Sequence, residues 1–259
     1  MMTIDDFRAP GPDLFIWPPI IRDGPLWFTK PVLLAVVCAV LVIAFCWAAF
    51  ARPKLVPRGI QNAAEYVYVF VRDQIARPQL GADADRWMGL LFTLFLLVLT
   101  WNLVGIIPFV QFPVSSHIAF PAVLAIAVFL LKIYLGIRHQ GGLLGYLKNV
   151  AVPADLPKGA LGIYVPLELA HQFLFSFTTH AIRVFANMFA GHMLLAFFSS
   201  VGFWFLFQEL TPLGAPIGLL GVAVTIIMTA FELFIMFLQA YLFTMLSAMY
   251  ISSGLRTEH

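Results

Sequence analysis

The residue that most restricts the chemistry of this chain is Arg183, which lies inside a long apolar run. No Asp, Lys or second Arg occurs between Glu168 and Glu209. A lone guanidinium at membrane depth costs between about 2.5 and about 17 kcal/mol, depending on the reference state. Arginine keeps its charge in proteins, so it cannot lower this cost by losing a proton. Arg183 therefore requires an anion or water beside it, which predicts a partner, a pathway, or both.

Other polar residues recur at helical spacing in the same run and in the last apolar run. At about 100° per residue, the first stripe consists of Ser176, His180, Arg183 and Asn187, with Thr179 at its border. The second stripe has seven-residue spacing and consists of Thr225, Glu232 and Gln239. A carboxylate such as Glu232 in apolar surroundings must bind a proton or pair with a base. These stripes predict polar surfaces that face something other than lipid.

The two apolar runs are expected to form a hairpin that turns near residues 208–216. His192 precedes the turn centre by about 20 residues and Glu232 follows it by about 20, so the two match in depth and can face each other. Arg183 and Gln239 match in the same way at a deeper level, beside Asn187. Titratable groups at two depths suit a stepwise proton path.

Each of these residues also has a purely structural interpretation. His192 or Glu232 alone could equally well bridge two helices, since polar contacts between membrane helices are common. Arg183 could form an ion pair with Glu232, although depth matching pairs Glu232 with His192. Bridging is the favoured interpretation for three other residues, Asn102, Thr225 and His117.

The composition indicates a polytopic, all-α membrane protein. Hydrophobic residues make up 61% of the chain, charged residues 11%, and the mean hydropathy is +0.93. Soluble domains have about 25% charged residues, so a soluble enzyme is excluded. Cys38 and Cys46 share one apolar segment and are interpreted as small apolar residues. No metal site, cofactor or nucleic-acid partner is expected.

The chain is expected to be one membrane domain of about five spans with an amphipathic interfacial helix. Residues 32–51, 87–108 and 117–137 have the length of single spans. Residues 59–80 are too charged to span and are expected to lie along the interface. Lys132 can extend its side chain from the third span to the interface. The other segments are an outside N-terminal segment (1–31), an inside loop (138–162) and an inside tail (254–259).

Two C-terminal segments, 163–207 and 216–253, are each too long for one upright span. About 40 helical residues reach about 60 Å, roughly twice the hydrocarbon thickness of a bilayer. Either each segment is broken into two helices or it is strongly tilted, and we favour two long tilted helices. Tilts of this size are unusual, so the helices are expected to lean on something other than lipid.

The distribution of basic residues predicts the orientation. One side of the membrane receives two basic loops, with Arg52, Lys54, Arg58, Arg72, Arg77 and Arg86 in the first and Lys132, Arg138, Lys148 and Lys158 at the second. The other side holds Arg8, Arg22 and Lys30, diluted by four Asp. The positive-inside rule then places the N-terminus outside and the C-terminus in the cytoplasm.

Four segments resemble one family. The sequence RVFANMFAGH at 183–192 resembles the signature of subunit a of bacterial F-type ATP synthases, and ELFIMFLQAYLFTMLSAMYI at 232–251 resembles the last helix of that subunit. NLVGIIP at 102–108 and FPAVLA at 120–125 are similar to its second and third spans. The resemblance covers most of the chain from about residue 27 onward.

This resemblance implies a role for each matching residue. Arg183 would be the essential stator charge, with Asn187 and Gln239 beside it, and Glu168 would line an inner half-channel. Many members have an acid after the glycine of the signature and a histidine on the last helix; here His192 and Glu232 exchange these positions. Two further departures are Ser176-Phe177 in place of Arg-Pro and Phe185-Ala186 in place of Phe-Gly.

The resemblance also implies the setting in which the chain works. The tilted hairpin would face a c-ring, and two half-channels would carry protons to and from carboxylates of the ring, coupling proton flow to rotation and ATP synthesis. The expected partners are the c-ring, b-type stator subunits, the F1 sector indirectly and the lipid bilayer of a bacterial plasma membrane. The chain would not be an enzyme by itself.

Two alternatives come from other functional classes. One is a self-contained secondary transporter in which Arg183 binds an anionic substrate, although such proteins usually show internal repeats and broken midplane helices. The other is a membrane enzyme that uses the His and Glu residues with a metal, although the sequence has no HExxH motif.

Overall fold

The computed structural model describes residues 7, 9–15, 29–107, 110, 112–151, 161–208 and 214–255. Three predicted segments therefore lie wholly or largely outside the described residues: the N-terminal segment 1–31, the hairpin turn near 208–216 and the tail 254–259. Part of the inside loop 138–162 lies outside them as well.

The predicted all-helical membrane fold is confirmed. Within the described residues, five helical stretches are long and apolar enough to cross a membrane: Lys30–Phe50, Ile60–Ile106, Ala119–His139, Ser176–Gln208 and Gly214–Leu255. The α-helices are α1 (Lys30–Phe50), α2 (Ile60–Val71), α3 (Arg77–Leu80), α4 (Ala84–Leu103), α5 (Ala119–His139), α6 (Leu143–Ala151), α7 (Leu161–Ala170), α8 (Ser176–Phe203) and α9 (Gly214–Leu255).

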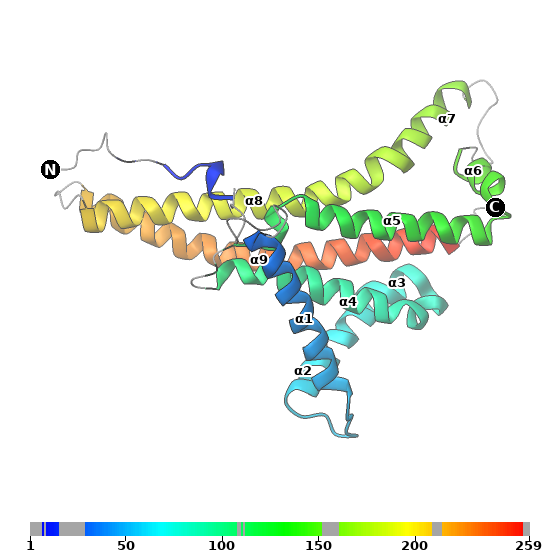
Figure 1. Cartoon of the computed structure of the whole chain (residues 1–259), viewed down its shortest axis with the longest axis horizontal. Coiled ribbons are helices and arrows are strands. Elements are labelled where there is room, and N and C mark those ends of the chain that lie inside the picture. The colour runs from blue at the N-terminus through cyan, green and yellow to red at the C-terminus, as the bar shows by residue number, and fades with distance from the viewer. Residues whose placement is uncertain are drawn as a thin grey trace.

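The helices α8 and α9 run side by side along the longest axis of the molecule (Figure 1). The 42 residues of α9 form one unbroken helix, which at 1.5 Å per residue reaches about 60 Å. Helix α8 has π-helical turns at both ends, His171–Phe175 and Trp204–Gln208. The first turn joins α8 to α7, which contains Pro166 and bends away from α9 (Figure 1). Proline and π-helical turns are common causes of such bends.

A core of apolar side chains joins this hairpin to α4 and α5. Phe95 and Leu91 of α4, Val128 of α5, and Phe243 and Ile251 of α9 belong to one buried cluster. Both α4 and α5 pack along α9 (Figure 1). Helix α9 therefore has a covered side and a side with exposed apolar residues, as expected for a helix that meets lipid or another chain.

Helix α1 crosses the direction of the long hairpin and extends to one side of the molecule, with α2 at its far end (Figure 1). A π-helical turn, Arg72–Ala76, continues α2 into α3. The chain then reverses at Gly81, whose φ of 57° is readily accessible only to glycine, and α4 begins. The position of α2 and α3 at the membrane interface remains a prediction.

Glycines bring α8 and α9 into close contact. A Cβ atom added at Gly221 would lie 2.8 Å from the backbone nitrogen of Gly202. A Cβ atom added at Gly218 would lie 2.7 Å from Cγ of Leu206. Small residues allow membrane helices to approach until their backbones touch, so these glycines set the spacing of the hairpin.

We expect Gly221→Ala to lower the free energy of unfolding by about 1–3 kcal/mol, because the added methyl group overpacks a backbone contact. The measurement is the thermal denaturation of the purified complex in detergent. Gly89→Ala in α4 is the matched control, since a Cβ atom there would meet nothing within 4 Å. Equal midpoints for the two variants would show that the close contact does not limit stability.

Candidate functional site

His192 on α8 and Glu232 on α9 face each other inside the hairpin, as depth matching predicted. Nδ1 of His192 lies 3.6 Å from Oε1 of Glu232, within ion-pair distance when the imidazole is protonated. The glutamate is 2% exposed, and among the described residues its carboxylate oxygens have no hydrogen-bond partner. A Cβ atom at Gly191 would lie 3.4 Å from that carboxylate, so the glycine leaves room for it. A buried carboxylate in this state requires a proton, a charged imidazole or water.

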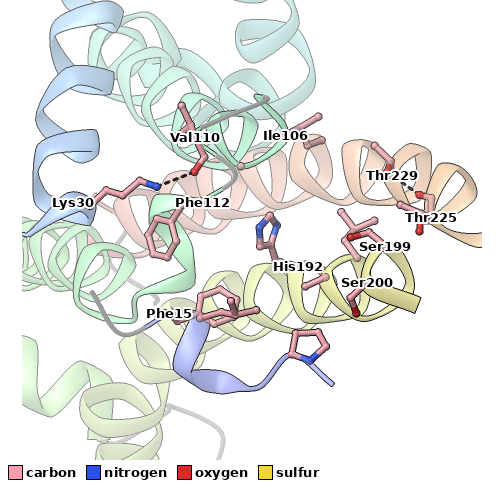
Figure 2. A pocket seen from close by; sticks show the side chains of 15 residues that line it. Phe15, Lys30, Ile106, Val110, Phe112, His192, Ser199, Ser200, Thr225 and Thr229 are labelled. Carbon is pink, nitrogen blue, oxygen red and sulfur yellow. Dashed lines mark hydrogen bonds between the residues drawn. The ribbon is translucent and has the colours of Figure 1, made fainter. Parts of the chain in front are cut away.

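His192, but not Glu232, lines a cavity of about 620 Å³ between α8, α9 and the N-terminal part of the chain (Figure 2). The polar side chains that line the cavity are Lys30, His192, Ser199, Ser200, Thr225 and Thr229. The 3-10 turn Pro12–Phe15 forms one wall, where Phe15 is buried against Phe189 and lies near the imidazole of His192. A cavity of this size with six polar side chains in its lining can hold several water molecules and thus a proton path to His192.

Sequence reasoning missed four of these polar residues, namely Lys30, Ser199, Ser200 and Thr229. Spacing could have identified two of them, because Ser199 follows His192 by seven residues and Thr229 lies four after Thr225. Lys30 could not have been found in this way. Its ammonium donates a hydrogen bond to the carbonyl of Val110, 80 residues away in the chain (Figure 2).

Arg183 lies on the opposite, exposed side of α8. It shares this face with Asn187, Ala186 and Ala190, all of them exposed. Within the described part of the chain, Arg183 forms no hydrogen bond and no ion pair. The structural alternative of an Arg183–Glu232 ion pair is therefore wrong for these residues, since Glu232 meets His192. The guanidinium is directed away from the fold of its own chain.

The predicted level of Arg183, Asn187 and Gln239 is only partly formed. Gln239 is 2% exposed and lies inside the fold, whereas Arg183 and Asn187 are exposed. No hydrogen bond between described residues joins Gln239 to Arg183, and Oε1 of Gln239 has no such partner. The placing of Gln239 beside Arg183 therefore stays a prediction, since matched depth along two helices does not determine which side of each helix faces the other.

The other half of the predicted stripe is buried. His180 is 2% exposed and packs its ring against Phe243, with centroids 4.0 Å apart. The hydroxyl of Tyr250 donates to the carbonyl of Ser176 at 3.0 Å. Thr179 is exposed and bonds back to the carbonyl of Phe175. The stripe lies at the edge of the packed face of α8, so some of its side chains are buried in the fold and others are exposed.

Glu168 takes part in a polar group at the end of the hairpin remote from the cavity. Its Oε1 accepts a hydrogen bond from Nε2 of Gln172 at 3.0 Å, and Oε1 of Gln172 accepts one from Lys132. Lys132 is only 3% exposed, so the prediction that its side chain reaches the interface is wrong. The lysine points into the contact between α5, α9 and the π-helical turn before α8.

Two residues with a favoured structural interpretation have hydrogen-bond partners within the chain. Asn102 is fully buried; its Nδ2 donates to the carbonyl of Met236 and its Oδ1 accepts from Ser115. This bridge between α4 and α9 agrees with the structural interpretation. Thr225 bonds back to the carbonyl of Gly221 and also lines the cavity.

Comparison with known proteins identifies a family over nearly the whole chain. The family described as "ATP synthase A chain" matches residues 32–252. The "ATP synthase subunit a" of Streptomyces lividans is 40% identical over 262 residues, covering 98% of this chain and 89% of that protein. Proteins of the same description from Nocardioides sp. and Rhodococcus erythropolis are each 36% identical, covering 98% and 99% of this chain and 95% and 94% of theirs.

We expect Ser199→Cys and Thr225→Cys variants to react with a water-soluble thiol reagent, because both positions line the cavity. The measurement is labelling in vesicles, in a background with Cys38→Ala and Cys46→Ala to remove the native thiols. Thr244→Cys is the control, since Thr244 is fully buried on the same helix as Thr225. Labelling of the control as fast as of the other two would contradict a water-accessible cavity.

Proposed function

Because the chain belongs to the ATP synthase A chain family, the proton-translocating stator subunit of the Fo sector, we propose that Arg183 separates an outer from an inner half-channel. The chain is part of the ATP synthase complex, and the catalytic sites of that complex lie in F1. It is a multi-pass membrane protein with bacterial relatives. Because the chain belongs to this family, the two alternatives, a self-contained transporter and a membrane enzyme, are set aside.

The observation that carries the proposal is the exposed guanidinium of Arg183, the one charged group on a face of α8 that it shares with Asn187, Ala186 and Ala190. An uncompensated cation at membrane depth is stabilised strongly by an acid on a neighbouring chain. Ala186 and Ala190 have small side chains on the same face, so a neighbouring helix can approach α8 closely. The proposed neighbour is the c-ring, which would present one carboxylate at a time to Arg183.

The cavity beside His192 and Glu232 is the proposed outer half-channel. A proton would enter through the cavity, bind to the His192–Glu232 pair and pass to a carboxylate of the c-ring. The neutral carboxyl group can then face lipid, so the ring can turn. Each proton brings about 2.3 kcal/mol per 100 mV of membrane potential, in addition to the pH term.

Arg183 and Glu168 are proposed to complete the cycle on the inner side. When the protonated carboxyl group returns from lipid, the nearby guanidinium favours its ionised form and the proton leaves towards Glu168. The fixed positive charge of Arg183 also repels hydronium, which prevents a direct leak between the half-channels. Asn187, exposed one turn from Arg183, is placed to contact the same neighbouring chain.

The proposed orientation has the N-terminus outside and the C-terminus in the cytoplasm. Two observations support it. N-terminal residues Phe15 and Lys30 line the cavity. Glu168 lies on α7, before the other end of α8, and is linked through Gln172 to Lys132, whose ammonium lies near Tyr250 in the C-terminal part of α9. We further propose b-type stator subunits as direct partners and the F1 sector as an indirect one.

Arg183→Ala is expected to abolish coupled transport, because no other cation occupies that face of α8 in the described residues. The measurement is ATP-driven proton pumping into vesicles that contain the assembled complex. Arg138→Ala, an exposed arginine at the end of α5, is the control and is expected to pump normally. Sustained pumping by the Arg183 variant would overturn the assignment of the stator charge.

Glu232→Gln is expected to slow proton pumping about tenfold or more without preventing assembly, because the amide cannot bind and release a proton. The exchange variant His192→Glu with Glu232→His provides the control. It keeps one acid and one base at the same contact, so it is expected to pump faster than Glu232→Gln. Unchanged pumping in Glu232→Gln would remove Glu232 from the path.

A further inference from the structure

Lys132 is a buried cation that has no role in the proton path proposed above. It lies near the end of α5, is 3% exposed, and its ammonium lies 5.2 Å from the ring centroid of Tyr250 on α9. A buried charge is costly unless it is paired or hydrogen-bonded. Its hydrogen-bond partner among the described residues is Oε1 of Gln172, 40 positions later in the chain.

In the contact between Lys132 and Gln172, lysine must be the hydrogen-bond donor. An ammonium group can only donate hydrogen bonds, so it holds the amide oxygen of Gln172 towards itself. The amide nitrogen of Gln172 must then point away from Lys132, and it donates to Oε1 of Glu168 at 3.0 Å. Glu168 is thereby held as a hydrogen-bond acceptor, four residues before Gln172 on the neighbouring turn.

The position of Gln172 explains why an anchor is useful there. It lies in the π-helical turn His171–Phe175, which joins α7 to α8. Such turns lack the regular hydrogen bonds of an α-helix and often mark functional sites. The hydroxyl of Tyr250 bonds to the carbonyl of Ser176 directly after this turn. Lys132 and Tyr250 therefore hold both the side chain and the backbone of this junction.

We propose that Lys132 is a positioning residue of the inner proton path: through Gln172 it orients the carboxylate of Glu168 to accept the proton released beside Arg183. This inference rests on the proposed role of Glu168 in the inner half-channel. The competing explanation is that Lys132 only joins α5 to α8. The two differ in one respect, because a positioning residue acts through Glu168 and a structural bridge does not.

A double-mutant cycle distinguishes these explanations. The four complexes are the parent, Lys132→Met, Glu168→Gln and the double variant, each measured for ATP-driven proton pumping in vesicles and for the amount of assembled subunit. We expect Lys132→Met and Glu168→Gln each to slow pumping about tenfold, and the double variant to be no slower than Glu168→Gln alone. Lys132→Arg keeps a donor-only cation and is expected to retain more than half of the parent rate.

Two further variants serve as controls. Lys54→Met removes an exposed lysine and is expected to pump like the parent. Gln172→Leu breaks the link while keeping Lys132, so it is expected to repeat the effect of Lys132→Met and replaces it in the cycle if that variant does not assemble.

The outcomes separate the inference from the proposed function. If Glu168→Gln is slow but Lys132→Met pumps within about twofold of the parent, or if the two losses multiply, the positioning role is overturned and the role of Glu168 stands. A Lys132→Arg variant that assembles but is as slow as Lys132→Met also overturns it. If Glu168→Gln pumps like the parent, both the inner role of Glu168 and this inference fail, while the role of Arg183 is tested separately.

Discussion

A charge that leaves water inside a membrane must meet an opposite charge, a hydrogen-bond partner or a water-filled space, and the functional features of this chain depend on that constraint. Three ionisable residues differ in how far the described chain satisfies this constraint. Lys132 is buried with an amide partner, and Glu232 is buried beside His192, which lines a cavity. Arg183 has no partner within the described chain. For this reason we propose that its charge is stabilised by another subunit.

The long hairpin of α8 and α9 fixes the relative positions of these side chains. The close contact of Gly202 and Gly221 brings the two backbones together, and α9 continues without a break past Glu232 and Gln239 to its end. An unbroken helix transmits register over its whole length, because each residue advances by about 1.5 Å and about 100°. His192 and Glu232 thus meet even though about 40 residues of the sequence separate them.

The errors of prediction concern the sides of helices and contacts that are distant in sequence. Helical spacing placed Ser176, His180, Arg183 and Asn187 on one stripe, yet the edge of the packed face runs through it and separates His180 from Arg183. Hydropathy placed Lys132 near a span end, where an extended side chain reaches the interface. Gln172 of a segment far along the chain offers it an internal partner in place of solvent.

The sequence by itself determined the membrane class, the long C-terminal helices, the matched depth of His192 and Glu232, and the need of Arg183 for a partner. Each of these follows from composition, segment length or position along one helix. Only the tertiary structure decided that Arg183 faces outward, that Gln239 faces inward, and that Lys30 and Phe15 complete the cavity. The physical reason is that helical periodicity gives relative angles on one helix, whereas the packing of neighbouring helices decides which of those angles are covered.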